Sequence, residues 1–245
     1  MPLPRHTLGS SNPGRHFELT RWSIVRAAGR DTPGARDALQ HLCTAYWYPL
    51  YAFVRRQGNP PDAAQDLTQE FFTRLLEHDW LADVDQNKGR FRSFLLASMK
   101  HFLANEWDRD RAKKRGGGRS PISLDALTAE SRYAMEPAGA ETPETIFQRR
   151  WALTLLEQVM TRLRGEFTAA GKAEIFDELK AMLTGDKTPY AEVGQRLGMN
   201  EGAVKVAVHR LRKRYRDLIR EEIAQTVESD GEVEDELRDL MSALA

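Results

Sequence analysis

The segment NEGAVKVAVHRLRKRYRDLI, residues 200–219, combines a dense set of cations with an apolar helical periodicity. Six Lys or Arg lie among the twelve positions from Lys205 to Arg216, with no acidic residue between them. A cationic helix face is suited to a DNA major groove, where Lys and Arg neutralise phosphates and donate to base edges. The opposite face should pack on a protein core, because apolar residues recur there at helical spacing. These residues are Val204, Val208, Leu211, Tyr215 and Leu218.

Seven side chains on or beside the outer face of this helix are the candidate contacts to duplex DNA. Lys205 and Arg210 could donate to guanine edges, and Val206 could meet a thymine methyl group. The other cations are expected to neutralise phosphates, which gives affinity without sequence information; they are Arg212, Lys213, Arg214 and Arg216. The candidate set is Asn200, Lys205, Val206, His209, Arg210, Arg212 and Lys213.

The stretch TPYAEVGQRLGM, residues 188–199, predicts a short helix directly before the basic one. Thr188 is placed to cap a helix that has Pro189 at its first position. Gly198 can take a positive φ in the turn that follows, and Asn200 is placed to cap the next helix. A short helix, a turn with glycine and a cationic second helix predict a DNA-binding helix-turn-helix. A purely structural helical hairpin has the same pattern and remains the alternative.

The segment DAAQDLTQEFFTRLLE, residues 62–77, predicts an amphipathic helix with an acidic outer side. Carboxylates at positions 62, 66 and 70 could suggest a metal site. No second helix supplies carboxylates or histidines at a matching spacing, so no metal is expected. A surface that faces a cationic partner is the better interpretation. The candidate contacts are Asp62, Asp66, Gln69 and Glu70.

A third segment, residues 84–118, places a polar loop before a helix that mixes aromatic and basic residues. Bases stack on aromatic side chains and phosphates need cations, so the mixture suits single-stranded or melted nucleic acid. Phe91, Phe94 and Phe102 are nevertheless expected in the core, whereas Trp107 stands beside the basic cluster from Arg109 to Arg115.

The formal net charge of zero hides a strong segregation of charge along the chain. Residues 201–220 and 100–119 are basic blocks, whereas residues 60–86 and 221–245 are acidic blocks. One anionic and one cationic partner are therefore expected. No enzyme motif stands out: the six histidines are scattered, and neither a P-loop nor a nucleophile elbow is present. We expect no catalytic residue and no cofactor.

The N-terminal residues and the cysteine content favour a cytoplasmic protein. The first fifteen residues have no apolar core of the kind found in signal peptides, and no apolar run approaches the length of a membrane span. Cys43 is the only cysteine, so there is no disulfide framework and no Cys-based zinc site. A reducing compartment without membrane contact fits best.

Almost every periodic segment is helical, so the sequence predicts an all-α fold. Helices are expected at about 18–29, 35–57, 60–78, 90–114, 144–165, 171–184, 188–197, 200–225 and 231–244. The Gly-, Ser- and Pro-rich residues between the fourth and fifth helices predict a flexible linker between two helical domains. The expected parts are a tail at 1–16, a domain at 17–115, the linker at 116–142, a helix-turn-helix domain at 143–222 and an acidic helical extension at 223–245.

Taken in this order, the motifs resemble those of RNA polymerase sigma factors of the extracytoplasmic-function (ECF) type. DLTQEFF resembles the polymerase-clamp helix of that family, and GRFRSFL resembles the start of its promoter-melting region. YAEVGQRLGMNEGAVKVAVHRLR is similar to its helix-turn-helix for the −35 element. The resemblance implies a non-catalytic subunit that binds core RNA polymerase, recognises the −35 and −10 promoter elements and opens DNA.

The resemblance also implies roles for individual residues. Asp62, Asp66, Gln69 and Glu70 would face basic helices of the polymerase clamp. The loop around residues 87–92 would capture a flipped −10 base, and the next helix would line the melted strand. The implied −10 contacts are Asn87, Lys88, Arg90, Arg92, Lys100, His101, Asn105 and Arg109.

Three features depart from the family pattern. Ala203 and Ala207 stand where polar or basic residues are common, so the −35 sequence is expected to be unusual. Gln65 replaces one member of an acidic pair, and a phosphate on nearby Thr68 would restore negative charge there. A Ser/Thr kinase or an anti-sigma factor is therefore a candidate regulator. The third departure is the extension, whose helix carries an apolar side that invites docking; its members are Val233, Leu237, Leu240 and Leu244.

The alternative to a sigma factor is a plain helix-turn-helix regulator that acts without core polymerase. That class explains the basic helix equally well. It leaves the acidic helix at 62–77 and the basic-aromatic segment at 84–118 without a role.

Overall fold

A computed structural model describes residues 33–77, 90–113, 124–134, 141–185, 187–227 and 230–245. Within these ranges the chain is helical, with turns and no strand, so the expected all-α fold is confirmed. The expected helix at 18–29 lies outside the described residues. The helices are α2 (Pro33–Arg56), α3 (Pro61–Glu77), α4 (Phe91–Lys113), α5 (Leu124–Ala134), α6 (Pro143–Ala169), α7 (Ala173–Leu179), the 3-10 helix η2 (Lys180–Leu183), α8 (Tyr190–Leu197), α9 (Glu201–Ala224) and α10 (Asp230–Leu244).

An aromatic core holds α2, α3 and α4 together. Phe71 of α3 meets Phe102 of α4 edge to face, with ring centroids 5.8 Å apart, and Tyr46 of α2 meets Phe91 at 5.2 Å. All four side chains are at most 1% exposed. Burying each such ring contributes roughly 1.5–3 kcal/mol, with a further ~1 kcal/mol for edge-to-face geometry. The expectation that Phe91, Phe94 and Phe102 belong to the core is confirmed.

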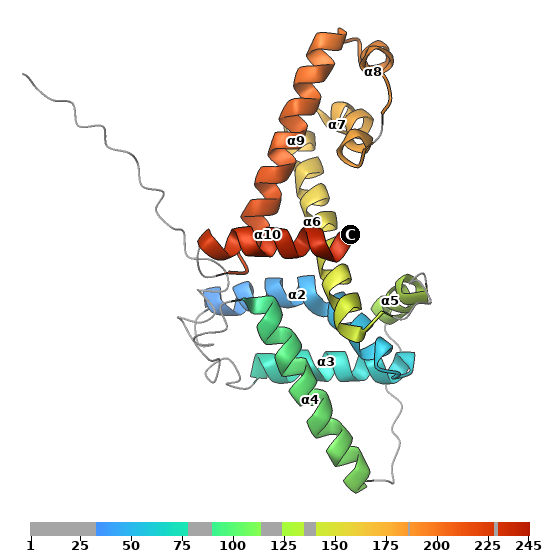
Figure 1. Ribbon diagram of the computed structural model, residues 1–245, viewed down its shortest axis with the longest axis vertical. Coiled ribbons are helices and arrows are strands. Elements are labelled where there is room, and N and C mark those ends of the chain that lie inside the picture. The colour runs from blue at the N-terminus through green and yellow to red at the C-terminus, as the bar shows by residue number, and fades with distance from the viewer. Residues whose placement is uncertain (1–32, 78–89, 114–123, 135–140, 186, 228–229) are drawn as a thin grey trace, which may run out of the picture.

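The long helix α6 connects the lower and upper parts of the molecule (Figure 1). Thr142 caps it by accepting a hydrogen bond from the backbone N–H of Thr145 at 3.2 Å, and Pro143 follows at the first helical position. Its first half packs along α2 and its second half along α9. Helix α6 therefore packs directly on both parts, in addition to any connection through residues 116–142. The division into two helical domains stays a prediction.

Helix α5 lies within the range 116–142 that the sequence predicted to be a linker. Tyr51 and Arg55 of α2 both donate hydrogen bonds to the Glu130 carboxylate of α5, at 2.6 and 2.8–2.9 Å. The guanidinium of Arg132 lies over the ring of Tyr48, 4.2 Å from its centroid. The sequence predicted a linker here because residues 116–142 as a whole are rich in Gly, Ser, Ala and Pro, and this composition obscured the eleven residues that form α5.

The acidic extension folds back onto the rest of the chain as α10. This helix crosses the junction between the two parts and packs on α6 and α9 (Figure 1). Val233 and Leu240 are buried, and Leu237 and Leu244 are partly buried. The expected apolar side of this helix is therefore confirmed, and it packs against the rest of the same chain.

Candidate nucleic-acid interface

Three residues stabilise the turn between α8 and α9: Gly194, Gly198 and Asn200. Gly198 has a φ of 64°, as expected, and ends α8. Asn200 caps α9: its side-chain oxygen accepts from the backbone N–H of Ala203 at 2.8 Å. Gly194 permits a close approach, because a Cβ there would lie 2.5 Å from the carbonyl oxygen of Met199. Helix α8 begins at Tyr190 with Pro189 as its N-cap residue, one position later than expected.

Helix α9 buries one side and exposes the cationic side. Val204, Val208 and Leu211 are at most 2% exposed. Val206 is 49% exposed, which is unusual for a large apolar residue and leaves its methyl groups available among cations. The candidate contacts that the structure leaves exposed on this surface are Asn200, Lys205, Val206, His209, Arg210, Arg212 and Lys213. The predicted orientation of the helix is therefore confirmed.

Two arginines of α9 are held by neighbouring elements. Arg212 donates to the carbonyl oxygen of Met182 in η2 at 2.9 Å. Arg214 binds both oxygens of Glu166 on α6, at 2.6 and 2.8 Å, and Glu221 at 2.7 Å. These hydrogen bonds, above all that with Glu166, raise the pKa of Arg214. In this conformation the guanidinium of Arg214 joins α9 to α6, so the expected contact with DNA phosphate stays an untested prediction.

The outer side of α3 carries the four side chains expected there. Asp62, Asp66, Gln69 and Glu70 are all exposed, with Glu70 hydrogen-bonded to Arg74. They form an acidic strip that a cationic partner could reach; we call these four residues the α3 acidic face.

Thr68 does not belong to the α3 acidic face. Its side chain is 0% exposed, and its hydroxyl donates to the carbonyl oxygen of Ala64 at 2.7 Å. A kinase cannot reach this hydroxyl in the folded chain, and a buried phosphate dianion would be strongly disfavoured. The prediction of a phosphorylation switch at Thr68 is therefore wrong.

Helix α4 presents a mixed polar and aromatic surface. Lys100, His101 and Asn105 are exposed, and Lys100 pairs with Glu144 of α6 at 2.7 Å. Trp107 is 46% exposed, so it is the aromatic of this segment that could stack on a ligand. Asn87, Lys88 and the side chain of Arg109 lie outside the described residues.

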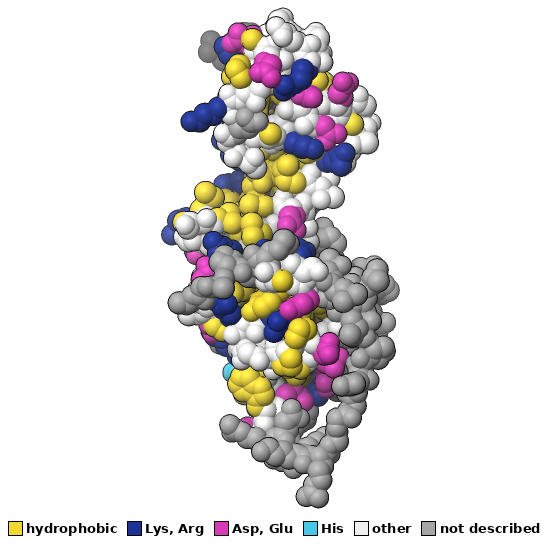
Figure 2. Space-filling model, turned by 90° about the vertical axis from the view of Figure 1, so that its right-hand side faces the viewer, with side chains coloured by type: hydrophobic (Ala, Val, Ile, Leu, Met, Phe, Trp, Pro, Cys, Tyr) yellow, Lys and Arg dark blue, Asp and Glu magenta, His cyan; other side chains and the backbone are white. Residues whose placement is uncertain are grey.

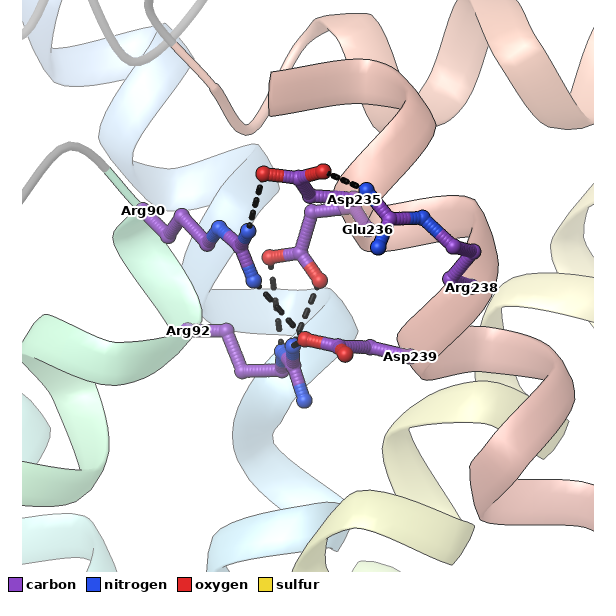
Figure 3. Close-up of polar contacts among 6 residues, drawn as sticks. All are labelled: Arg90, Arg92, Asp235, Glu236, Arg238 and Asp239. Atoms are coloured by element: carbon purple, nitrogen blue, oxygen red, sulfur yellow. Dashed lines mark hydrogen bonds and ion pairs between the residues drawn. The ribbon is translucent and has the colours of Figure 1, made fainter. Parts of the chain in front are cut away.

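The two remaining −10 candidates face α10 (Figure 3). Arg92 is 4% exposed and binds Glu236 at 2.5 Å and Asp239 at 2.8 Å, with its guanidinium 4.1 Å from the ring centroid of Trp151. Arg90 pairs with Asp239 at 2.7 Å and with Asp235 at 3.2 Å. The expectation that these arginines contact DNA is not met in this conformation, because α10 carboxylates occupy them.

Glu236 and Asp239 are functional candidates that the sequence analysis missed. Glu236 is 0% exposed, and burial raises its pKa against the opposing effect of Arg92. The sequence does contain a signal for them: the acids at 235, 236 and 239 lie on one side of the helix expected at 231–244, next to its apolar side. The sequence does not pair these acids with Arg92, because Arg92 lies more than 140 residues away from Glu236 and Asp239 in the chain.

Among the residues that the structure describes, no cluster of His, Cys, Asp or Glu could hold a metal ion. No helix in the described ranges is long and apolar enough to cross a membrane. Figure 2 shows acidic and basic side chains interspersed around the upper part of one face, with apolar side chains gathered at the junction below it.

These features define an all-helical protein with one cationic helix face and one acidic face. The chain is 27% identical over 175 residues to the ECF RNA polymerase sigma factor SigE of Mycolicibacterium smegmatis. The match covers 71% of this chain and 58% of that protein, so the chain spans less than two thirds of that protein's length. No family model and no solved structure matches the chain. The similarity supports a sigma-factor-like relationship.

Proposed function

We propose that this chain is an alternative sigma factor that binds core RNA polymerase, recognises −35 and −10 promoter elements and initiates transcription without catalysing a reaction itself. The observation that carries the proposal is the cationic face of α9, exposed directly after the capped turn at Asn200. The similarity to an ECF sigma factor supports the same class. A cytoplasmic location, where promoter DNA and polymerase are found, follows from this role.

In this proposal α8 and α9 are a DNA-binding helix-turn-helix, with α9 in the major groove of the −35 element. Arg210 and Lys205 donate to guanine edges, and the exposed Val206 contacts a thymine methyl group. Lys213 binds phosphate and gives salt-dependent affinity. Arg212 keeps donors beyond the one that binds Met182, and these serve phosphate as well.

The α3 acidic face binds a basic surface of the polymerase. Asp62 and Asp66 are exposed on the same helix side as Gln69 and Glu70, so one helix presents a continuous strip to a cationic partner. Complementary charge of this kind speeds association and selects the partner.

The exposed side of α4 binds melted −10 DNA. Trp107 offers a ring on which a base can stack, an interaction of about 1–3 kcal/mol. Lys100 and Asn105, also exposed on α4, supply a cation and hydrogen-bonding groups.

The second candidate is a helix-turn-helix regulator that acts without core polymerase. The α9 surface serves that function equally well. The α3 acidic face and the exposed Trp107 favour the sigma factor, because a plain regulator has no role for them.

The test combines pull-down of bacterial core RNA polymerase with run-off transcription from promoters selected by the holoenzyme. We expect Asp66→Lys to weaken core binding at least tenfold, and Arg210→Ala to abolish promoter-specific transcripts while core binding stays intact. Glu174→Lys, the same charge change at an exposed position of α7, is the matched control and should leave both activities unchanged. Absence of core binding by the unmodified chain would refute the sigma function and favour the regulator.

A further inference from the structure

Helix α10 places three carboxylates against the two arginines at the start of α4 (Figure 3). Asp239 receives hydrogen bonds from both Arg90 and Arg92, at 2.7 and 2.8 Å. Glu236 binds Arg92 through two hydrogen bonds, and Asp235 pairs with Arg90. A phosphate would need the same guanidinium donors, so α10 and a nucleic-acid backbone compete for one site.

The burial of Arg92 makes this competition exclusive. Its side chain is 5% exposed, enclosed by Glu236 on α10 and by the ring of Trp151 on α6. The backbone N–H of Phe91 donates to the carbonyl oxygen of Thr226 at 3.1 Å, so the first turn of α4 is also fixed to the segment before α10. No external ligand reaches Arg92 while α10 stays in place.

The attachment of α10 is suited to release. Besides Glu236, its buried side chains are Val233 and Leu240; Leu237 and Leu244 are only partly buried, and Met241 is 67% exposed. Burial disfavours the charged form of Glu236 and offsets part of its attraction to Arg92, as the raised pKa of this carboxyl reflects. Asp235 and Asp239 are 44% and 46% exposed at the edge of the contact, where an incoming polyanion can begin to displace them.

We propose that α10 is an intramolecular inhibitor: its carboxylates occupy Arg90 and Arg92, and α10 must leave before these arginines can bind the phosphates of single-stranded DNA. The inference rests on the proposed function only in naming DNA as the ligand. The partners of the acidic extension are Arg90, directly before α4, and Arg92 in its first turn, because the α10 side chains at this contact face these two arginines.

The central variant is Asp239→Asn, because Asp239 touches both arginines and is partly exposed, so the core is undisturbed. The matched control is Glu234→Gln, which removes one negative charge from the same helix at a position that pairs with Arg220 instead. Both proteins and the unmodified chain are titrated with fluorescein-labelled dT15. Hydrogen exchange of the peptides 91–95 and 230–244 is followed in parallel, with 201–218 as an internal reference.

We expect Asp239→Asn to bind dT15 at least tenfold more tightly and to exchange at least tenfold faster in both peptides. Glu234→Gln should stay within twofold of the unmodified chain. Adding Arg90→Ala to Asp239→Asn should abolish the gain in affinity. Glu236→Gln, which keeps the shape of the buried side chain, should give the same gain as Asp239→Asn.

Faster exchange without tighter dT15 binding would overturn the inference, because the release of Arg90 and Arg92 from α10 would then not increase the affinity for single-stranded DNA. Unchanged exchange and affinity in both Asp239→Asn and Glu236→Gln would also overturn it and make α10 a fixed structural helix. Tighter dT15 binding by a chain that fails to bind core polymerase would support the inhibitor and refute the sigma function, so the two proposals fail separately.

Discussion

Arg214 of α9 binds the carboxylate of Glu166 on α6 through two hydrogen bonds, from Nε at 2.8 Å and from Nη2 at 2.6 Å. Paired, bidentate contacts of this kind fix the orientation of two helices as well as their separation. The pair connects the basic helix to the long helix that also packs on α2. Its loss should therefore loosen the position of α9 while leaving the exposed cations of that helix in place.

We predict that Arg214→Ala lowers the free energy of unfolding by about 1–2 kcal/mol, after allowing for its partial exposure of 35%. Urea denaturation followed by circular dichroism measures the change. Arg216→Ala removes an exposed arginine two residues away and should change stability by less than about 0.5 kcal/mol. Equal losses in the two variants would contradict the assignment of Arg214 to the helix contact.

A second prediction concerns the turn before α9. Gly194→Ala should destabilise the protein by about 1–3 kcal/mol, because the new Cβ would lie 2.5 Å from the backbone carbonyl oxygen of Met199. Gly165→Ala is the control within a helix: a Cβ there meets no heavy atom within 4 Å, so alanine should stabilise by about 0.5–1 kcal/mol. Thermal melts of both variants show whether each substitution lowers or raises the stability. A neutral Gly194→Ala would mean that α8 and the turn can separate freely.

The faces of α9 followed from the sequence because they depend on local periodicity and on two capping residues. Gly198 can be recognised because glycine adopts a positive φ easily, and Asn200 because its side chain can accept a hydrogen bond at a helix start. Arg92 shows the limit of such inference. It follows a polar loop and looks exposed, yet its carboxylate partner Glu236 comes 144 residues later in the chain. Pairing over that distance depends on the fold and leaves no local pattern.

The predictions made for Thr68 and for the segment that forms α5 were wrong for related reasons. Thr68 sits between exposed residues in the sequence, but a helix turns by about 100° per residue, and its neighbour Gln65 is buried on the same side. Helix α5 lies within a stretch whose Gly, Ser and Pro content predicted a linker, and the hydrogen bonds that Tyr51 and Arg55 make to Glu130 hold it against α2. In both cases tertiary contacts, which the local sequence does not show, determine the structure.

The third prediction separates base contacts from phosphate contacts on α9. Arg210→Ala should weaken binding to the cognate −35 duplex by about 1–3 kcal/mol and leave scrambled duplex unchanged, since a base edge is lost. Lys213→Ala should weaken all duplexes alike and reduce the slope of log affinity against log salt by about 1. Fluorescence anisotropy at several salt concentrations distinguishes them. If both variants lose equally on cognate and scrambled DNA, Arg210 is a phosphate contact.

The last prediction uses the ionisation of Glu130. Hydrogen bonds from Arg55, and then from Tyr51, hold the pKa of this carboxyl below its usual range. A carboxyl with a lowered pKa in the folded state stabilises the fold above its unfolded pKa of about 4.3. That contribution is lost as the pH falls through the lower folded pKa. Glu130→Gln should therefore be less stable than the unmodified chain at pH 7, and in thermal melts the difference should shrink as the pH falls below the unfolded pKa. Glu174→Gln, at an exposed position of α7, should follow the unmodified chain throughout. Parallel profiles for Glu130→Gln and the unmodified chain would show that α5 does not depend on this carboxylate.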